Sequence, residues 1–127
     1  MSNKRINILV AEDNDLNAKL IAAVLSADIF AATFVVDGTE VLAACEHEDF
    51  DVILMDLRMP EMDGFEATDR LRKSDKRNCD TPIIAITADA ILGQEDKCRA
   101  VGVNGYLTKP VSPDDLIQMI FSQVQKG

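Results

Sequence analysis

Several side chains that could act together in one site lie far apart along this chain. Three are acidic: Glu12 and Asp13 in the run ILVAEDN, and Asp56 in the run DVILMDLRMP. The others are the hydroxyl of Thr87, in PIIAITA, and the ammonium of Lys109, in GYLTKP. Neighbouring carboxylates repel one another, whereas a hard divalent ion such as Mg²⁺ binds a few carboxylates and keeps several waters. These residue types predict a magnesium site.

A charge count indicates what such a site would accept. The three carboxylates carry −3, Lys109 adds +1, and one Mg²⁺ ion brings the total to zero. An arriving phosphoryl group would meet the metal, Lys109 and the Thr87 hydroxyl, and phosphoryl transfer depends mainly on such positioning and charge neutralisation. Asp56 is the candidate acceptor, because an ionised carboxylate is a competent nucleophile.

These side chains can meet only if the fold brings the ends of several strands together. Short apolar runs that are partly β-branched predict the strands. Three of the runs show no polar alternation, which is typical of strands covered on both faces. Strands are expected at Ile6–Ala11, Ala31–Val36, Val52–Met55, Pro82–Ile86 and Asn104–Leu107.

Helical patterns lie between these strands. The first has an apolar stripe at three- and four-residue spacing, and the fourth is expected from about Asp89 to Ala100, ended by Gly102. Asp37, Asp63 and Ser112 are placed to cap the second, third and fifth helices, and Asp15 is expected to cap the first. The stripe of the first helix consists of Leu16, Leu20, Ala23, Val24 and Ala27.

Alternating strands and helices imply an α/β fold of (βα)5 type, with a parallel sheet and helices on both faces. Periodicity does not fix the strand order, and 2-1-3-4-5 is a common order for such units. In that order the ends of strands one, three, four and five are neighbours, so the acidic residues, Thr87 and Lys109 would share one edge. No repeat or linker divides the chain, so residues 1–127 are expected to form one domain.

Composition excludes several classes of function. The net charge of −9 at pH 7 argues against direct binding of nucleic acid. No apolar run approaches the roughly 20 residues of a membrane span, and the start MSNKRINILVAEDN does not fit a signal peptide, so no membrane insertion and a cytoplasmic location are expected. The cysteines, Cys45, Cys79 and Cys98, are widely spaced and are expected to be free thiols.

The runs ILVAEDN, DVILMDLRMPEMDGFE, PIIAITA and GYLTKPV resemble the receiver domain of two-component response regulators. The resemblance covers roughly residues 6 to 125 and implies the flavodoxin-like receiver fold. It implies that a histidine kinase or a histidine phosphotransfer protein phosphorylates Asp56 in a reaction that needs Mg²⁺, with Mn²⁺ able to substitute. The protein would then be no enzyme beyond catalysing its own phosphorylation and dephosphorylation.

The resemblance also assigns roles to single residues. Lys109 would contact the phosphoryl group, and the Lys109–Pro110 peptide would be cis. Asp13, Asp56, the Arg58 backbone carbonyl and, in an indirect or supporting role, Glu12 would hold the metal.

A switch is implied as well. Thr87 would move toward the phosphoryl oxygens, with the small Ala88 beside it leaving access to the site. Tyr106 would change its rotamer in response. The downstream protein would bind the face formed by the fourth helix, the fifth strand and the fifth helix, where Tyr106 lies.

Arg58 and Asp89 each lie two residues beyond a site residue, Asp56 and Thr87. They could pair across the mouth of the pocket and hinder the water that hydrolyses the phosphoryl-aspartate. They could equally be two solvated charges that contribute under about 1 kcal/mol. The sequence does not decide between these interpretations.

Other functions are less consistent with the sequence. A haloacid-dehalogenase-like phosphatase needs a second Asp two residues after the nucleophile, where this chain has Arg58. A flavodoxin-like flavin carrier needs a first loop that binds phosphate, and AEDNDLN would repel one. A receiver-like module that is never phosphorylated stays open. The start MSNKR favours a stand-alone regulator, whereas the EDN motif also resembles receivers of hybrid histidine kinases.

Overall fold

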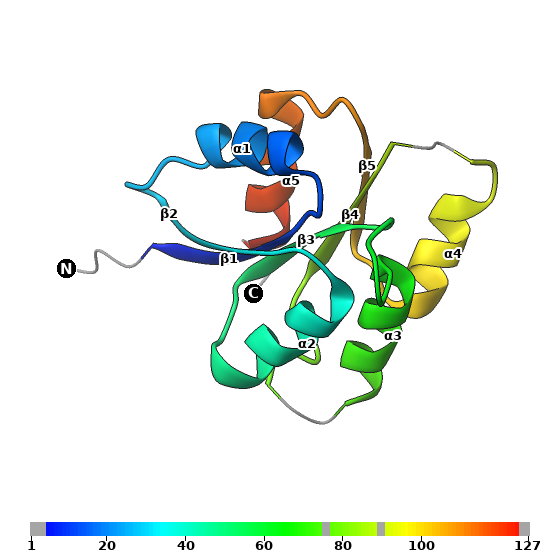
Figure 1. The fold of residues 1–127 in the computed structure, drawn as a ribbon. Coiled ribbons are helices and arrows are strands. Elements are labelled where there is room, and N and C mark those ends of the chain that lie inside the picture. The colour runs from blue at the N-terminus through cyan, green and yellow to red at the C-terminus, as the bar shows by residue number, and fades with distance from the viewer. Residues whose placement is uncertain (1–4, 75–76, 89–90, 125–127) are drawn as a thin grey trace.

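The computed structural model describes residues 5–74, 77–88 and 91–124, and a five-stranded sheet in the order β2-β1-β3-β4-β5 forms its centre (Figure 1). All four neighbouring pairs are parallel, which confirms the predicted sheet and its order. Each predicted strand is present within one residue of its expected bounds. The strands are β1 (Ile6–Ala11), β2 (Phe30–Val35), β3 (Val52–Asp56), β4 (Ile83–Thr87) and β5 (Gly105–Thr108).

Within the described residues, five helices cover the two faces of the sheet (Figure 1). Because side chains alternate along a strand, β3 presents Ile53 and Met55 to one apolar cluster and Val52 and Leu54 to the other. The first cluster is closed by α2, α3 and α4, and the second by α1 and α5. The helices are α1 (Asp15–Val24), α2 (Gly38–His47), α3 (Gly64–Lys73), α4 (Gln94–Val101) and α5 (Pro113–Val124).

The predicted apolar stripe of α1 is wrong. Leu16 and Leu20 are 66% and 58% exposed, and the sheet-facing positions are Ile21, Val24 and Leu25. Only Val24 belongs to both sets. Ile21 and Leu25 bury more apolar area than the two alanines of the predicted stripe, so the helix is rotated to place them inward. This rotation leaves two leucines on the outer surface of α1.

The predicted start of α4 is also wrong. Asp89 lies outside the described residues, and the helix begins only at Gln94. Gly93 adopts φ 84°, a left-handed conformation that a right-handed helix cannot contain. The other end is as predicted, because Gly102 stops the helix with φ 108°.

Side-chain caps begin three helices at the predicted residues. Asp37 accepts a hydrogen bond from the Glu40 N–H at 2.9 Å, and Asp63 accepts one from the Glu66 N–H at 2.9 Å. Ser112 caps α5 in the same way. None of the helices in the described part of the chain combines the length and the apolar character needed to cross a bilayer.

Candidate functional site

The strand ends place the predicted side chains at one edge of the sheet. Asp56 and Thr87 are the last residues of β3 and β4, and Thr87 is in register with Thr108 of β5. The Lys109 N–H donates to the Thr87 carbonyl at 2.7 Å, and Glu12 directly follows β1. The β2-β1-β3-β4-β5 order is what makes these ends neighbours.

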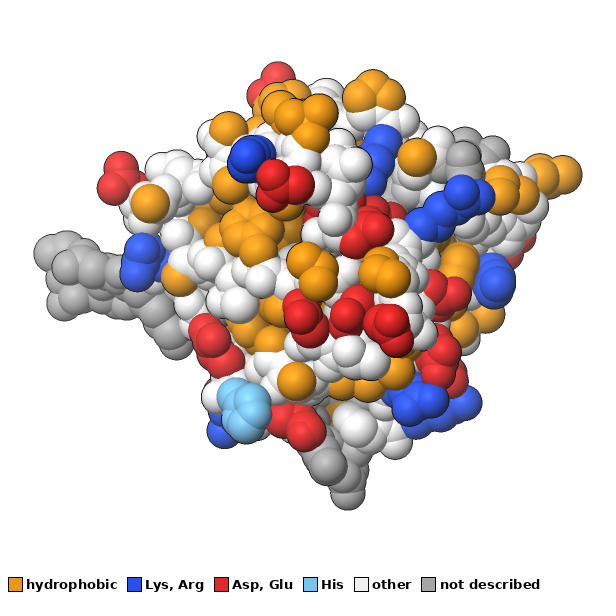
Figure 2. All heavy atoms as spheres, viewed as in Figure 1, with side chains coloured by type: hydrophobic (Ala, Val, Ile, Leu, Met, Phe, Trp, Pro, Cys, Tyr) orange, Lys and Arg blue, Asp and Glu red, His pale blue; other side chains and the backbone are white. Residues whose placement is uncertain are grey.

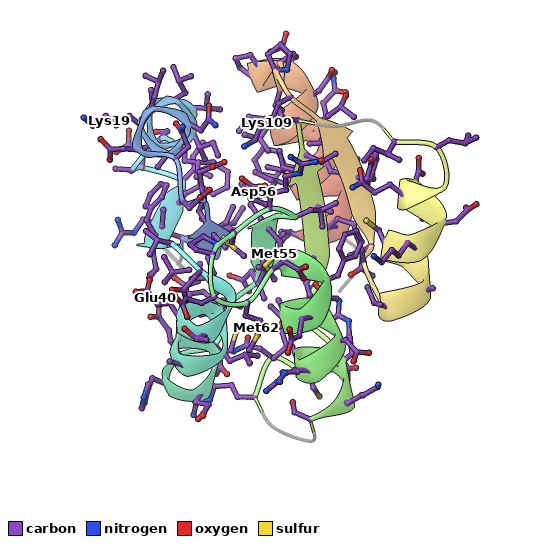
Figure 3. All side chains as sticks on the ribbon, turned by 45° about the vertical axis from the view of Figure 1, so that its right-hand side comes forward. Lys19, Glu40, Met55, Asp56, Met62 and Lys109 are labelled. Atoms are coloured by element: carbon purple, nitrogen blue, oxygen red, sulfur yellow. The ribbon has the colours of Figure 1, made fainter. Side chains whose placement is uncertain are left out.

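Lys109 lies between two carboxylates. Its Nζ is 3.0 Å from Asp56 Oδ2 and 2.8 Å from Glu12 Oε1, and Figure 3 shows Lys109 and Asp56 at the same end of the sheet. The side chains of Lys109, Glu12 and Asp56 are 18%, 1% and 7% exposed. Burial alone would lower the pKa of Lys109, but its contacts with Glu12 and Asp56 outweigh burial and raise that pKa. Burial, reinforced by the nearby Asp56, raises the pKa of Glu12 despite the contact with Lys109.

The three acidic residues fit a divalent cation. One carboxylate oxygen each from Glu12, Asp13 and Asp56 lies within 4.8 Å of the others. Glu12 Oε1 is buried and, although paired in charge with Lys109, has no well-aligned hydrogen bond within the described part of the chain. Hard oxygen ligands with net negative charge are the set that Mg²⁺ prefers. The donor set therefore matches the predicted metal.

The second oxygen of Glu12 supports the start of α1. Glu12 Oε2 accepts a hydrogen bond from the Asn14 N–H at 3.2 Å, and Asn14 caps α1 by accepting from the Asn17 N–H at 3.0 Å. Asp15 is not the cap, contrary to expectation, and instead lies 3.2 Å from Lys19 on the helix surface (Figure 3).

Both oxygens of Asp56 already have partners. Oδ2 accepts from Lys109, and Oδ1 accepts from the Arg58 N–H at 3.0 Å. Arg58 is exposed, and Asp89, the predicted partner of its side chain, lies outside the described residues. The backbone N–H of Arg58 thus contacts the site directly.

The predicted switch residues lie beside this edge. Thr87 is fully buried, whereas Ala88 is exposed. Tyr106 is half-buried on β5, and its hydroxyl donates to Gln94 Oε1 at 2.7 Å. No periodicity or motif singles out Gln94, so sequence reasoning missed this contact. The predicted cis Lys109–Pro110 peptide is present.

An apolar groove of about 310 Å³ lies next to Lys109. Leu20 and Val24 of α1 line one side and Val111 and Leu116 the other. Sequence reasoning missed this groove because it predicted that the wrong face of α1 packs against the sheet. Acidic side chains gather in the middle of the face seen in Figure 2. The groove adjoins the charged site, because Glu12 and Lys109 are also among its lining residues.

A family model for the response regulator receiver domain matches residues 8–121. The chain belongs to the receiver domain family. Receiver domains act in two-component phosphorelay systems, in which an aspartate accepts a phosphoryl group. This receiver domain is 38% identical over 130 residues to hybrid signal transduction histidine kinase B of Dictyostelium discoideum, where the match covers 94% of this chain but only 7% of the kinase. It is 35% identical to the polar-differentiation response regulator DivK of Brucella ovis, covering 91% of this chain and 94% of DivK.

Solved structures agree with this placement. The receiver domain of sensor histidine kinase PA1611 from Pseudomonas aeruginosa PAO1 superposes with a TM-score of 0.87 at 34% identity, covering 96% of this chain and 99% of that one. That structure has a magnesium ion coordinated in its active-site cleft. In this receiver domain, carboxylate oxygens of Glu12, Asp13 and Asp56 lie close enough together to hold a metal ion.

Proposed function

We propose that Asp56 accepts a phosphoryl group from the phosphohistidine of a histidine kinase or a histidine phosphotransfer protein. The observation that carries the proposal is the position of Asp56: it ends a buried strand, 3.0 Å from the Lys109 ammonium and within the acidic group formed with Glu12 and Asp13. A carboxylate held next to a fixed cation can accept negative charge without rearrangement of solvent.

Magnesium would be held by Asp13, Asp56 and the Arg58 carbonyl, with Glu12 in a supporting role, and Mn²⁺ could take its place. The bound ion would neutralise charge on the transferring group. Lys109 supplies a second positive charge, because its raised pKa keeps it protonated at neutral pH. Thr87 would bind a phosphoryl oxygen through its hydroxyl.

The transfer would end on the protein itself, without turnover of a separate substrate. A phosphatase that uses an aspartyl nucleophile needs an acid or base close by to release its product, and Arg58, two residues after Asp56, stays protonated. The proposed protein is therefore a switch. A generic phosphomonoester should remain intact in its presence.

Two faces would contact other proteins. The groove beside Lys109, with the exposed Leu20 at its edge, lies next to Asp56 and suits a donor that must approach it. The face of α4, β5 and α5 carries Tyr106, and we assign it to the downstream partner. Contact with nucleic acid is not part of the proposal, because the chain is strongly acidic. A cytoplasmic location follows from the proposed donor.

Phosphorylation by acetyl phosphate or by a phosphorylated histidine phosphotransfer protein tests the proposal. Wild type should gain one phosphoryl group in Mg²⁺ or Mn²⁺ and none in EDTA, as measured by the mass of the intact protein. Asp56→Asn should gain none. Asp69→Asn, which removes a partly exposed carboxylate on α3 that pairs with Lys73, is the matched control and should behave as wild type. Labelling that persists in Asp56→Asn would contradict the proposal, and unlabelled wild type would favour a module that is never phosphorylated.

A further inference from the structure

The loop that follows Asp56 is attached to the start of α2, a helix with no residue in the proposed site. The Gly38 N–H, at the first residue of α2, donates to the Met62 carbonyl at 2.9 Å. Met62 is buried, and Figure 3 shows it near the start of α2, where Glu40 is labelled. The two elements are therefore in direct contact through backbone atoms.

There is no room for a side chain at Gly38. A Cβ atom there would lie 2.5 Å from the Met62 carbonyl oxygen and 2.8 Å from Met62 Cβ. Real Cβ atoms essentially never come so close to other atoms, so any larger residue must push the loop and α2 apart. The backbone of Gly38 does not have a positive φ, so the requirement for glycine comes from this approach and not from conformation.

The loop has little freedom to absorb such a shift elsewhere. At one end the Leu57 N–H donates to Ile86 of β4 at 3.1 Å, and at the other the Gly64 N–H donates to the Leu57 carbonyl at 3.2 Å. Glu61 is held at φ 65°, in the left-handed region. Arg58 lies inside this closed loop, where its N–H binds Asp56 Oδ1 at 3.0 Å.

The start of α2 is itself fixed. Asp37 accepts from the Glu40 N–H at 2.9 Å, and the Glu40 carboxylate accepts at 2.9 Å from the N–H of Val36, the residue before the cap. Because the start of α2 is fixed and the loop after Asp56 is closed, the contact between them can determine where that loop lies.

We propose that Gly38 and Met62 are positioning residues for the metal site: their contact sets the position of Arg58, and through it the orientation of Asp56. The inference rests on the proposed magnesium site, because the Arg58 carbonyl is one of its proposed ligands. Neither Gly38 nor Met62 is among the residues proposed to bind the metal or the phosphoryl group. Groups that orient the ligands of a metal commonly change its affinity by about 10- to 100-fold when they are altered.

Titration calorimetry of Mg²⁺ binding to the unphosphorylated protein tests the inference. Gly38→Ala should bind Mg²⁺ about tenfold more weakly than wild type. In the absence of metal, its Arg58 amide should show a changed chemical shift in the ¹H–¹⁵N spectrum. Asn78→Ala is the matched control, since Asn78 holds the other end of α2 through the Cys45 and Glu48 carbonyls. It should lower stability and leave both readouts unchanged.

Met62→Ala provides a second test should Gly38→Ala fail to fold. It keeps the backbone hydrogen bond and removes the side chain that fills the space at Gly38, so a smaller loss of Mg²⁺ affinity is expected. Wild-type affinity in a folded Gly38→Ala or in Met62→Ala overturns the inference, as does an equal loss in Asn78→Ala. If wild type itself binds no Mg²⁺, the proposed function fails. That result differs from failure of this inference alone, in which wild type binds Mg²⁺ and the variants bind it equally well.

Discussion

The hydroxyl of Tyr106 donates a hydrogen bond to Gln94 Oε1 at 2.7 Å, which joins β5 to the first residue of α4. The residue before the helix, Gly93, provides no side-chain cap, so this contact from β5 helps to hold the start of α4. The opposite end is tied to α3, because Arg72 Nε donates to the Gly102 carbonyl at 3.0 Å. A change in Tyr106 would therefore act first on the start of α4.

Gln94→Leu should loosen Tyr106. The change keeps a side chain of similar size and removes the acceptor, so we expect a loss of about 1 kcal/mol in the free energy of unfolding and a more accessible ring. Quenching of tyrosine fluorescence by acrylamide measures accessibility cleanly, because the chain has one Tyr and no Trp. Gln94→Glu retains an acceptor and should stay close to wild type. Equal quenching in Gln94→Leu and wild type would show that the contact does not hold the ring.

Titration of Tyr106 should be shifted to alkaline pH. Burial, followed by the nearby Cys98 and Glu95, raises the pKa of Tyr106 above its ordinary value of 10.0. The folded state therefore keeps the phenol proton longer than the unfolded state does. The resulting stability is fully present below pH 10 and is lost as pH rises through the folded-state pKa. Absorbance at the phenolate band follows the titration, and Tyr106→Phe should remove this part of the alkaline loss of stability.

Asp13→Asn should have opposite effects with and without magnesium. Without metal, Asp13 adds a third negative charge within 4.8 Å of Glu12 and Asp56, which share the Lys109 ammonium, so removing that charge should raise the free energy of unfolding by about 1 kcal/mol or less. With Mg²⁺ at 100 times its dissociation constant, wild type should gain about 2.7 kcal/mol, and the variant much less. Urea denaturation in EDTA and in Mg²⁺ gives both values. The same order of stability under both conditions would argue against a metal ligand at Asp13.

The sequence was sufficient to predict the sheet and the residues that lie at its edge. Buried parallel strands have long apolar runs without alternation, so β1, β3 and β4 were predicted with nearly correct bounds. Once the strand order is known, Asp56, Thr87 and Lys109 must lie close together, because each ends or follows a strand of the same direction.

The errors have physical causes of their own. The α1 stripe was misplaced because two rotations of that helix offer similar apolar patterns, and only packing against Phe30 and the sheet distinguishes them. The start of α4 was misplaced because its polar sequence gives a weak pattern, whereas Gly93 adopts a left-handed conformation that periodicity does not reveal. Contacts between distant residues, such as Gly38 with Met62, have no signature in a single sequence.

Thr68→Val should be neutral or stabilising. Thr68 of α3 is fully buried, and its hydroxyl has no hydrogen-bond partner among the residues that the structure describes. An unpaired buried hydroxyl costs about 1–3 kcal/mol, and valine has almost the same shape without that cost. We expect thermal unfolding to shift upward in Thr68→Val. Thr68→Ser keeps the hydroxyl and leaves a methyl-sized cavity, so it should shift downward; a loss of stability in the valine variant would mean that the hydroxyl has a partner after all.

Asn78 connects three segments at the end of the molecule opposite the site. Its amide donates to the Cys45 carbonyl at 2.9 Å and to the Glu48 carbonyl at 2.7 Å. Its side-chain oxygen accepts from the Phe50 N–H at 2.8 Å and from the Thr81 hydroxyl at 2.9 Å. Asn78 also has φ 72°, a conformation that Asn tolerates better than most residues. All four hydrogen-bonding positions of the amide are thus used.

Asn78→Ala should be among the more destabilising single changes in this chain. Loss of four hydrogen bonds, three of them partly buried, should lower the free energy of unfolding by about 2–3 kcal/mol, and alanine in the left-handed region should add about 1 kcal/mol. Asn78→Gly isolates the loss of the hydrogen bonds, because glycine adopts that φ without strain. Urea denaturation of the three proteins measures both. If Asn78→Gly matches wild type, the hydrogen bonds contribute little, and backbone conformation alone explains why asparagine stands here.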